Sequence, residues 1–404
     1  MERFISFVGL LVMVLIAFLL SDNKKKIYWK LVIGGIILQF MFGVIILKTS
    51  FGAMVFQWAT SFFNAILSFT NHGTNFVFGP LNDYTKIGFV FAISVLPVIL
   101  FMSTLMSILY HLGVMQKVIQ ATAWIMVKVL GTSGGESLAA AANIFVGQTE
   151  APLVIKPYIS KMTRSELLAL MTGGMATVAG SVLGVYVKMG VSAGHLLAAS
   201  VMSAPASLVC AKLMIPETEE SVTKGQVNIN LPKNSVNIID AATIGAIDGL
   251  KLALNVLAML LVFISLVALF NGVLSFVGGI FGHQELSLEL ITGYLFFPIA
   301  WIMGVPGHDS LIVGGLLGKK LILNEFVAYQ DLQTYMKDLS PRAVVIATYA
   351  LCGFANFGSI GIQVGGIGSL APERSRDLAR LGVKSLIAGT LACLMTACIA
   401  GILI

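Results

Sequence analysis

A polar, acidic stretch lies inside one of the apolar regions of the chain, at residues 142–152. Glu150 interrupts an alanine-rich run and Lys156 ends it, so no membrane-spanning helix, which needs about 20 apolar residues, fits through this stretch. A half-helix, a turn at Gly147 and a second half-helix would bring four polar side chains together at membrane depth: Asn143, Gln148, Thr149 and Glu150. Irregular backbone at that depth is tolerated only inside protein or around a watery cavity, so the stretch predicts a re-entrant hairpin at a binding site.

A surface loop that carries a solvated Glu150 is the alternative interpretation. An ionised carboxylate at the bilayer centre costs about 3 kcal/mol on insertion scales, so a buried Glu150 is expected to have a function. A second carboxylate, Glu325, follows the apolar runs 290–307 and 310–318, and again no continuous helix can be drawn through it.

The composition predicts an all-α, polytopic membrane protein. Of the 404 residues, 57% are hydrophobic and only 11% are charged, which excludes an ordinary soluble globular protein. The formal net charge of +6 comes from basic clusters at the ends of apolar runs, so it indicates topology and no nucleic acid partner. The four cysteines lie inside apolar runs without metal-ligand spacing, so we interpret them as packing residues: Cys210, Cys352, Cys393 and Cys398.

The sequence does not predict an enzyme, because the motifs that could suggest one have the wrong spacing. The run 314–319 is one residue short of a phosphate-binding loop, and Lys320 stands where that loop needs Ser or Thr. The adjacent residues His308, Asp309 and Ser310 do not form a triad, since triads are assembled from separated positions.

Basic clusters set the predicted topology. We place Lys24, Lys161, Arg164 and Arg374, with their basic neighbours, on the cytoplasmic side. This puts both chain termini on the periplasmic side.

The two halves of the chain resemble each other weakly. Gly180 follows Glu150 by thirty residues, and Gly358 follows Glu325 by thirty-three. Each half contains a hairpin with a carboxylate, then a span with small and polar residues at its centre, then a further span. Because the predicted topology has the two copies entering from opposite faces, the pattern indicates the inverted repeat of secondary transporters.

Polar residues at the centres of two spans suggest an ion site. Thr177 in the fourth span (167–187) and Asn356 in the seventh (343–372) lie beside Gly and Ser, where a helix can loosen and expose backbone carbonyls. Free carbonyls and neutral side-chain oxygens hold dehydrated Na+ in transporters. For the nearby glycines alone, a seam of small residues that lets helices approach closely is the alternative.

The candidate substrate groups are two carboxylates, two amides and two hydroxyls, with no arginine among them: Gln148, Thr149, Glu150, Glu325, Asn356 and Ser359. This set favours a neutral solute with many hydroxyl and amide groups, because buried donors and acceptors reject analogues that lack a matching group. Phe354 adds an apolar face. Lys319 and Lys320 are the nearest cations in the sequence, and we expect them at a surface turn.

Three segments resemble signatures of the concentrative nucleoside transporter family: residues 147–152, residues 318–329, which read GxKxxxNEFVAY, and residues 352–361. The chain length and the eight predicted spans are similar to those of bacterial members. The resemblance implies an elevator-type symporter in the bacterial inner membrane, assembled as a homotrimer, that imports nucleosides such as uridine with Na+.

The resemblance also implies roles for individual residues. Hairpin 1 would face the base through Gln148, Thr149 and Glu150, with Val182 against the ring. Hairpin 2 and the seventh span would face the ribose through Glu325, Phe354, Asn356 and Ser359. The implied Na+ ligands are Asn143, Val146, Thr177 and Val178.

Two alternatives stay open at this point. Thr177 stands where the sodium-coupled pattern commonly has Ser, so H+ coupling through Glu150 or Glu325 is one alternative. A membrane sensor or gate protein that binds nucleosides without transporting them is the other.

The implied domain plan divides the chain into seven parts: 1–50, the first two transmembrane helices, as scaffold; 51–81, an interfacial helix region; 87–130, the third helix and an amphipathic helix, as scaffold; 131–211, the first transport-domain repeat with hairpin 1 and helices 4 and 5; 212–250, a cytoplasmic linker; 251–283, helix 6, as scaffold; and 284–404, the second transport-domain repeat with hairpin 2 and helices 7 and 8.

Overall fold

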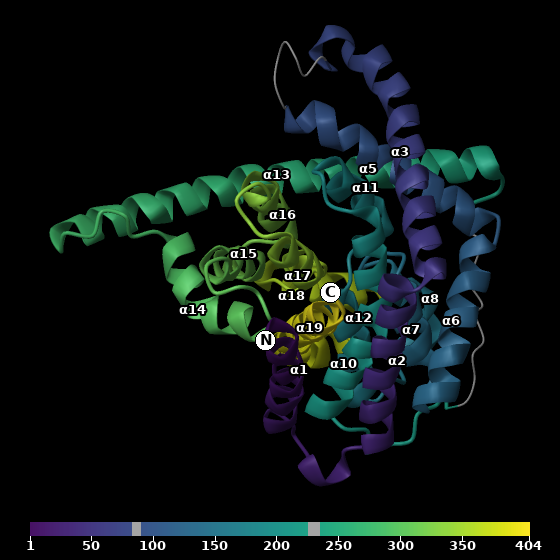
Figure 1. The fold of residues 1–404 in the computed structure, drawn as a ribbon. Helices are drawn as coiled ribbons and strands as arrows, with labels where there is room; N and C mark the ends of the chain where they lie inside the picture. Colours follow the sequence, from purple (N-terminus) through teal and green to yellow (C-terminus); the bar gives the residue numbers. More distant parts are fainter. Residues whose placement is uncertain (83–89, 225–234) are drawn as a thin grey trace.

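A computed structural model describes residues 1–82, 90–224 and 235–404, and every regular element in these parts is helical (Figure 1). The first half of the described chain contains α1 (Glu2–Leu19), η1 (Lys24–Lys26), α2 (Trp29–Lys48), α3 (Ser50–Phe78), η2 (Gly79–Asn82), α5 (Phe91–His111), α6 (Val114–Leu130), α7 (Gly134–Asn143), α8 (Ala151–Val154), α9 (Lys156–Ile159), α10 (Arg164–Ala176), α11 (Gly180–Lys188) and α12 (Ala193–Met214). The second half contains α13 (Ile238–Ile280), α14 (Leu288–Ile302), α15 (Ser310–Ile322), α16 (Glu325–Tyr335), α17 (Pro341–Leu351), α18 (Phe357–Leu370), η3 (Pro372–Arg374) and α19 (Ser375–Leu403).

The predicted all-α, multi-pass membrane fold is confirmed. Seven helical stretches of the described chain are long and apolar enough to cross a membrane. The short apolar helices α17 and α18 together occupy the predicted seventh span. The predicted third span starts at residue 87, but residues 83–89 lie outside the described part, and the described helix α5 begins at Phe91.

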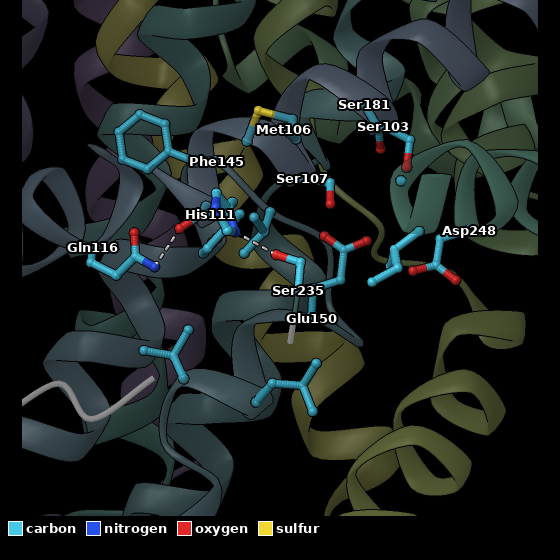
Figure 2. Close-up of a pocket in the computed structure, with 16 residues that line it drawn as sticks. Ser103, Met106, Ser107, His111, Gln116, Phe145, Glu150, Ser181, Ser235 and Asp248 are labelled. Carbon is cyan, nitrogen blue, oxygen red and sulfur yellow. Dashed lines mark hydrogen bonds between the residues drawn. The ribbon is translucent and has the colours of Figure 1, made fainter. Parts of the chain in front are cut away.

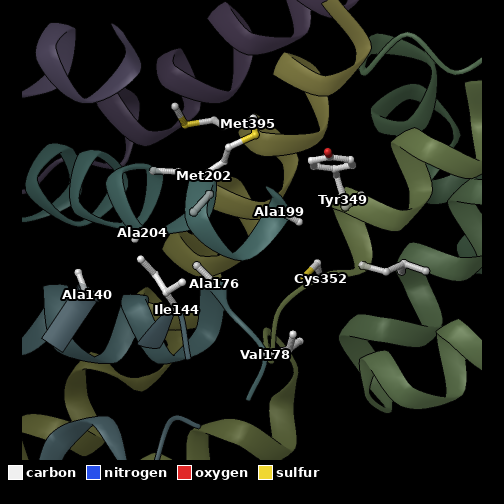
Figure 3. Packing of buried hydrophobic residues seen from close by; sticks show 14 of the residues in the cluster. Ala140, Ile144, Ala176, Val178, Ala199, Met202, Ala204, Tyr349, Cys352 and Met395 are labelled. Atoms are coloured by element: carbon white, nitrogen blue, oxygen red, sulfur yellow. The ribbon is translucent and has the colours of Figure 1, made fainter. Parts of the chain in front are cut away.

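Two of the spans are fully interrupted at their centres. The fourth span consists of α10 and α11, separated at residues 177–179, and the seventh consists of α17 and α18, separated at residues 352–356. The interruptions cross each other, because the Phe354 amide donates a hydrogen bond to the Thr177 carbonyl at 3.1 Å. Figure 3 shows Ala176 and Val178 of one interruption near Cys352 of the other.

Each half of the chain also contains a re-entrant hairpin before its interrupted span. In hairpin 1, α7 ends at Asn143, and the return arm is divided into α8 and α9, which contain Pro152 and Pro157. These prolines remove backbone donors and so limit the length of each helix. In hairpin 2, α15 turns at Leu323 and Asn324 into α16, whose start is capped by the Asn324 side chain accepting from the Val327 amide at 3.0 Å.

Hairpin 2, which contains Glu325, consists of α15 and α16 only. The sequence predicts a longer broken region that starts at residue 290. Residues 288–302 form the separate helix α14, which packs along α15. Glycines allow this close packing: a methyl group at Gly318 would lie only 2.2 Å from Thr292 Cβ. α14 therefore braces the α15 arm of hairpin 2 and is not itself an arm.

The predicted linker is shorter than residues 212–250, since α13 already begins at Ile238 and continues for 43 residues. The Asn237 side chain caps it by accepting from the Asp240 amide at 2.9 Å. Lys251, which follows the predicted linker, is 71% exposed on the surface of this helix. Residues 225–234 of the predicted linker lie outside the described part.

The first two helices pack on the bundle that contains the interrupted spans. α1 contacts α19, and α2 contacts both α12 and α19. Gln39 of α2 donates to Thr396 Oγ1 of α19 at 2.8 Å, in a buried position. α2 also contacts α3 and α6, so the assignment of residues 1–50 to the scaffold stays a prediction. The two chain ends also meet, because Arg3 donates to the Ile404 carbonyl at 2.5 Å.

The crossing of the two interruptions predicts an intolerant glycine. A methyl group at Gly353 would lie 2.5 Å from Cys393 Sγ and 2.8 Å from the Met175 carbonyl oxygen, so Gly353→Ala should lower stability by about 1–3 kcal/mol. Thermal unfolding in detergent measures this loss. Gly365→Ala is the control, because nothing lies within 4 Å of a methyl group there; an equal unfolding temperature for both variants would contradict the tight crossing.

Candidate functional site

The centre of the site is the carboxylate of Glu325, at the first turn of α16. Its two oxygens accept from different elements: Tyr186 of α11 donates to Oε1 at 3.0 Å, and Asn356 donates to Oε2 at 3.4 Å. Glu325 and Asn356 are 5% and 4% exposed. Burial of a carboxylate is expensive unless donors satisfy it, so these two contacts explain how Glu325 is kept inside the bundle.

Asn356 also starts the second half of the interrupted seventh span. Its side-chain oxygen accepts from the Ser359 amide at 2.8 Å and caps α18, while its amide group faces Glu325. An asparagine at this position satisfies a free amide of the helix start. The residue that ends the interruption therefore also orients the carboxylate.

A second series of contacts joins the two repeats. Gln148, in the hairpin 1 turn, donates to Ser359 Oγ at 3.0 Å. Its own side-chain oxygen accepts from Gln363 at 3.1 Å, and Gln363 donates at the same time to the Met171 carbonyl at 3.0 Å. The turn of hairpin 1 is thus held to α18 and α10 through side-chain amides.

Four of the predicted substrate residues, Gln148, Glu325, Asn356 and Ser359, therefore lie in one connected region. The other four are placed around it. Val182 is buried on α11, and Phe354 is half-buried in the crossing. Thr149 and Glu150 are exposed: Thr149 lies next to Gly366 of α18, and Glu150 faces a cavity beside α5 and α13.

The predicted Na+ ligands lie on hairpin 1 and in the first interruption, which are neighbouring segments. The Gly180 amide donates to the Phe145 carbonyl at 2.9 Å and ties these two segments together. Asn143 donates through its nitrogen to the Ala139 carbonyl at 3.0 Å, whereas its Oδ1 atom is buried and has no hydrogen-bond partner among the described residues.

The remaining predicted ligands would complete a set of neutral oxygens. Thr177 donates its hydroxyl proton to the Gly173 carbonyl at 2.9 Å, so its oxygen lone pairs stay available to a cation. Val146 and Val178 lie in non-helical backbone, where carbonyls are not committed to a helix. An unpaired amide oxygen, a hydroxyl and free carbonyls suit a hard cation such as Na+, so the residues present fit the ion.

Our expectation for Lys320 was wrong. It does not mark a surface turn, since it is only 3% exposed and donates to the Ala350 carbonyl at 2.8 Å. Ala350 lies in the last turn of α17, where a helix has free carbonyls and a partial negative charge that attract a cation. Lys319 is also paired, with Glu289 at 3.0 Å and with Asp331.

Tyr186 and Gln363 contact residues of the candidate site but were not found from the sequence. Tyr186 lies among apolar residues of α11, so its hydroxyl gave no signal of a partner. Gln363 gave a usable signal, because it is a polar residue in an apolar span, one helical turn after Ser359.

Three family profiles match successive parts of the chain. The profiles described as "Na+ dependent nucleoside transporter N-terminus" and "Na+ dependent nucleoside transporter C-terminus" match residues 8–81 and 195–401, and one described as "Nucleoside recognition" matches residues 92–193. The chain belongs to the concentrative, Na+-dependent nucleoside transporter family. The resemblance predicted from the three motifs is confirmed, as is the expectation that the protein is not an enzyme.

The chain has relatives in both bacteria and animals. The chain is 49% identical to the "Uncharacterized transporter YutK" of Bacillus subtilis, over 98% of each chain. It is 48% identical to an "Uncharacterized transporter" of Haemophilus influenzae, over 99% of this chain and 97% of the relative. It is 46% identical to human "Solute carrier family 28 member 3", where it spans 60% of the longer relative.

Solved structures of CNTnw share the fold of this transporter family member. An inward-facing, substrate-bound CNTnw structure matches with a TM-score of 0.95 at 45% identity, over 100% of this chain and 98% of that one. A CNTnw variant in an outward-facing state matches with the same TM-score and identity, over 100% of this chain and 99% of that one.

Gln363 should position Gln148 for the nucleoside. Gln363→Leu removes the donor and leaves the Gln148 oxygen buried without a partner, which costs about 1–3 kcal/mol. The KM for nucleoside uptake should therefore rise about tenfold or more. Gln333→Leu is the control, since Gln333 is exposed on α16. An unchanged KM in a Gln363→Leu protein that folds normally would contradict this role.

Proposed function

We propose that this protein is a symporter that imports nucleosides together with Na+ across the inner membrane of a bacterium. The main support is that one turn, at the tip of hairpin 1, contributes to both predicted sites. Gln148 of this turn contacts Ser359 of the substrate region, and the turn follows directly on Asn143, whose buried oxygen has no partner among the described residues.

In this proposal the ribose binds next to Glu325. The carboxylate accepts hydrogen bonds from ribose hydroxyls, Asn356 and Ser359 offer further donors and acceptors, and Phe354 covers the apolar side of the sugar. The base lies against the hairpin 1 turn, where Gln148, Thr149 and Glu150 match its amide edge and Val182 contacts the ring. A neutral substrate agrees with the absence of an arginine from these eight positions.

Na+ would be held by Asn143, Val146, Thr177 and Val178. Because hairpin 1 supplies ligands to the ion and Gln148 to the nucleoside, the ion favours the turn conformation that binds the base. Such a coupling is reciprocal: each ligand raises the affinity for the other by the same factor. The methyl group of Thr177 leaves the hydroxyl in place, so it does not remove the ligand.

The energy of one ion is sufficient for accumulation. One cation crossing at a potential of about −100 mV releases ~2.3 kcal/mol. A roughly tenfold inward Na+ gradient adds ~1.4 kcal/mol, and together these support a nucleoside gradient of several hundredfold.

The proposed motion is an elevator movement of the repeats against a scaffold built mainly from α5 and α13. These two helices pack closely, since a methyl group at Gly249 would lie 2.9 Å from Leu100 Cα.

The lipid-facing side of α13 is apolar and exposed, with Leu261, Phe270 and Phe276 at its surface. We propose that this face contacts lipid and two further copies in a homotrimer. Because the two chain ends are in contact, both lie on the same side of the membrane, and we propose that this is the periplasmic side.

Glu325 provides the test of the ribose site. Glu325→Gln keeps the size of the side chain but removes its charge, and a hydrogen bond to a charged group is worth about 1.5–3 kcal/mol. Nucleoside uptake at low substrate concentration should fall roughly tenfold to a hundredfold. Glu373→Gln is the matched control, since Glu373 is exposed. Normal uptake by the Glu325 variant in proteoliposomes would remove the ribose assignment.

Asn143 provides the test of the coupling ion. In wild-type proteoliposomes, uptake of a nucleoside panel should depend on Na+ when choline replaces it at fixed pH. Asn143→Ala removes one ligand, so half-maximal uptake should need about tenfold more Na+. The control is Asn64→Ala, at an exposed position of α3.

The outcomes separate the alternatives. Uptake that persists in choline but depends on pH would favour H+ coupling. Nucleoside binding without any uptake or counterflow would favour the sensor or gate protein. Identical Na+ titrations for wild type and Asn143→Ala would contradict the proposed ion site.

A further inference from the structure

A cavity of about 210 Å³ lies between hairpin 1 and the helix pair α5–α13 (Figure 2). Of the eight predicted substrate residues, only Glu150 lines it. The cavity is therefore a space separate from the region around Glu325 and Asn356, although the tip of hairpin 1 is common to both.

One part of the cavity wall is polar and incompletely paired. Ser181 is 6% exposed, lines the cavity, and its hydroxyl has no hydrogen-bond partner among the described residues. The same holds for the hydroxyl of Tyr110, which is buried at the end of α5. Buried polar atoms are nearly always hydrogen-bonded in proteins, so two such atoms at one cavity indicate a missing polar partner.

Two carboxylates face the same space. Glu150 extends from hairpin 1 and Asp248 from α13, and Figure 2 shows both directed into the cavity. No Lys or Arg is among the described residues that line the cavity, although Asp248 is paired at 3.7 Å with Lys251, which does not line it. The two carboxylates therefore favour a ligand with several N–H or O–H donors over an anion.

The cavity wall also has an apolar part, with Met106, Phe145 and Ile244 on three different elements, beside further polar residues such as His111 and Gln116. A bare metal ion would gain nothing from these side chains, whereas a flat ring would be covered by them. The combination of carboxylate acceptors, free hydroxyls and an apolar cover fits a neutral, hydroxylated ring compound.

We propose that this cavity is a second binding position for the nucleoside, formed jointly by hairpin 1 and the scaffold pair α5–α13. This inference rests on the proposed function. Glu150 contacts the base in both positions, and Asp248 and the unpaired Ser181 and Tyr110 hydroxyls replace the contacts made by Glu325 and Asn356. Since the start of α13 follows the proposed cytoplasmic linker, the cavity is a release position on the cytoplasmic side.

The scaffold side of this position is rigid. A methyl group at Gly245 would lie 2.7 Å from Ser107 Cβ, and Ser107 donates to the Ala241 carbonyl at 2.7 Å. The α5–α13 wall therefore keeps its shape while hairpin 1 moves. The proposed motion would bring Glu150 to the cavity and separate the nucleoside from it afterwards.

Thiol protection tests the second position directly. Ile244→Cys places a reactive group on the cavity wall, and the neighbouring Thr243→Cys, at an exposed position of α13, is the matched control. The four native cysteines are buried. Full-length protein in proteoliposomes is treated with a small methanethiosulfonate reagent at increasing uridine concentrations, and each variant is also made with Glu325→Gln and with Asp248→Asn.

Uridine should slow the modification of Ile244→Cys and leave Thr243→Cys unchanged. Protection should persist with Glu325→Gln, because the cavity does not use that residue. With Asp248→Asn, half-protection should need about tenfold more uridine, the equivalent of one charge-assisted hydrogen bond.

Absence of protection at Ile244→Cys would overturn the second position. Protection that disappears with Glu325→Gln would also overturn it, because the protection would then report only binding at the ribose site. Wild-type uridine uptake is measured in the same vesicles. No uptake together with full protection would contradict the proposed transport function and leave the cavity site supported.

Discussion

The crossing of two interrupted helices is the contact on which the site depends. The backbone hydrogen bond from Phe354 to Thr177 joins the two repeats at the centre of the bundle. Gly353 allows the two interrupted segments to approach each other closely. Helix ends inside a membrane protein leave backbone groups free, which is tolerated only where protein or a polar ligand surrounds them. Here those ends lie beside the hairpins, so the irregular backbone lines the proposed binding region.

Each repeat contributes a different half of that region. The second repeat supplies Glu325, held by Tyr186 and Asn356, and the first supplies the neutral oxygens next to Asn143. Gln148 connects the halves, because it contacts Ser359 and is held by Gln363. A ligand that orders the hairpin 1 turn therefore acts on both halves, which provides a physical route for coupling an ion to a nucleoside.

Much of this arrangement was visible in the sequence, because polar and glycine residues in apolar runs are costly and mark the interruptions. Glu150, Thr177, Glu325 and Asn356 were found in this way. The partners were harder to predict, since Lys320 is paired with a carbonyl thirty residues away and the Tyr186 hydroxyl lies on an apolar helix. The start of α13 was also predicted too late in the chain, because charged residues on the exposed side of a long helix resemble the composition of a linker.

The central claim is that the two halves bind their ligands jointly, and equilibrium binding to the purified protein tests it most directly. The Kd for uridine is measured in NaCl and in choline chloride at fixed pH and ionic strength, and the Kd for Na+ with and without uridine. The account predicts that Na+ tightens uridine binding and that uridine tightens Na+ binding by the same factor. Equal uridine Kd values in the two salts would contradict it.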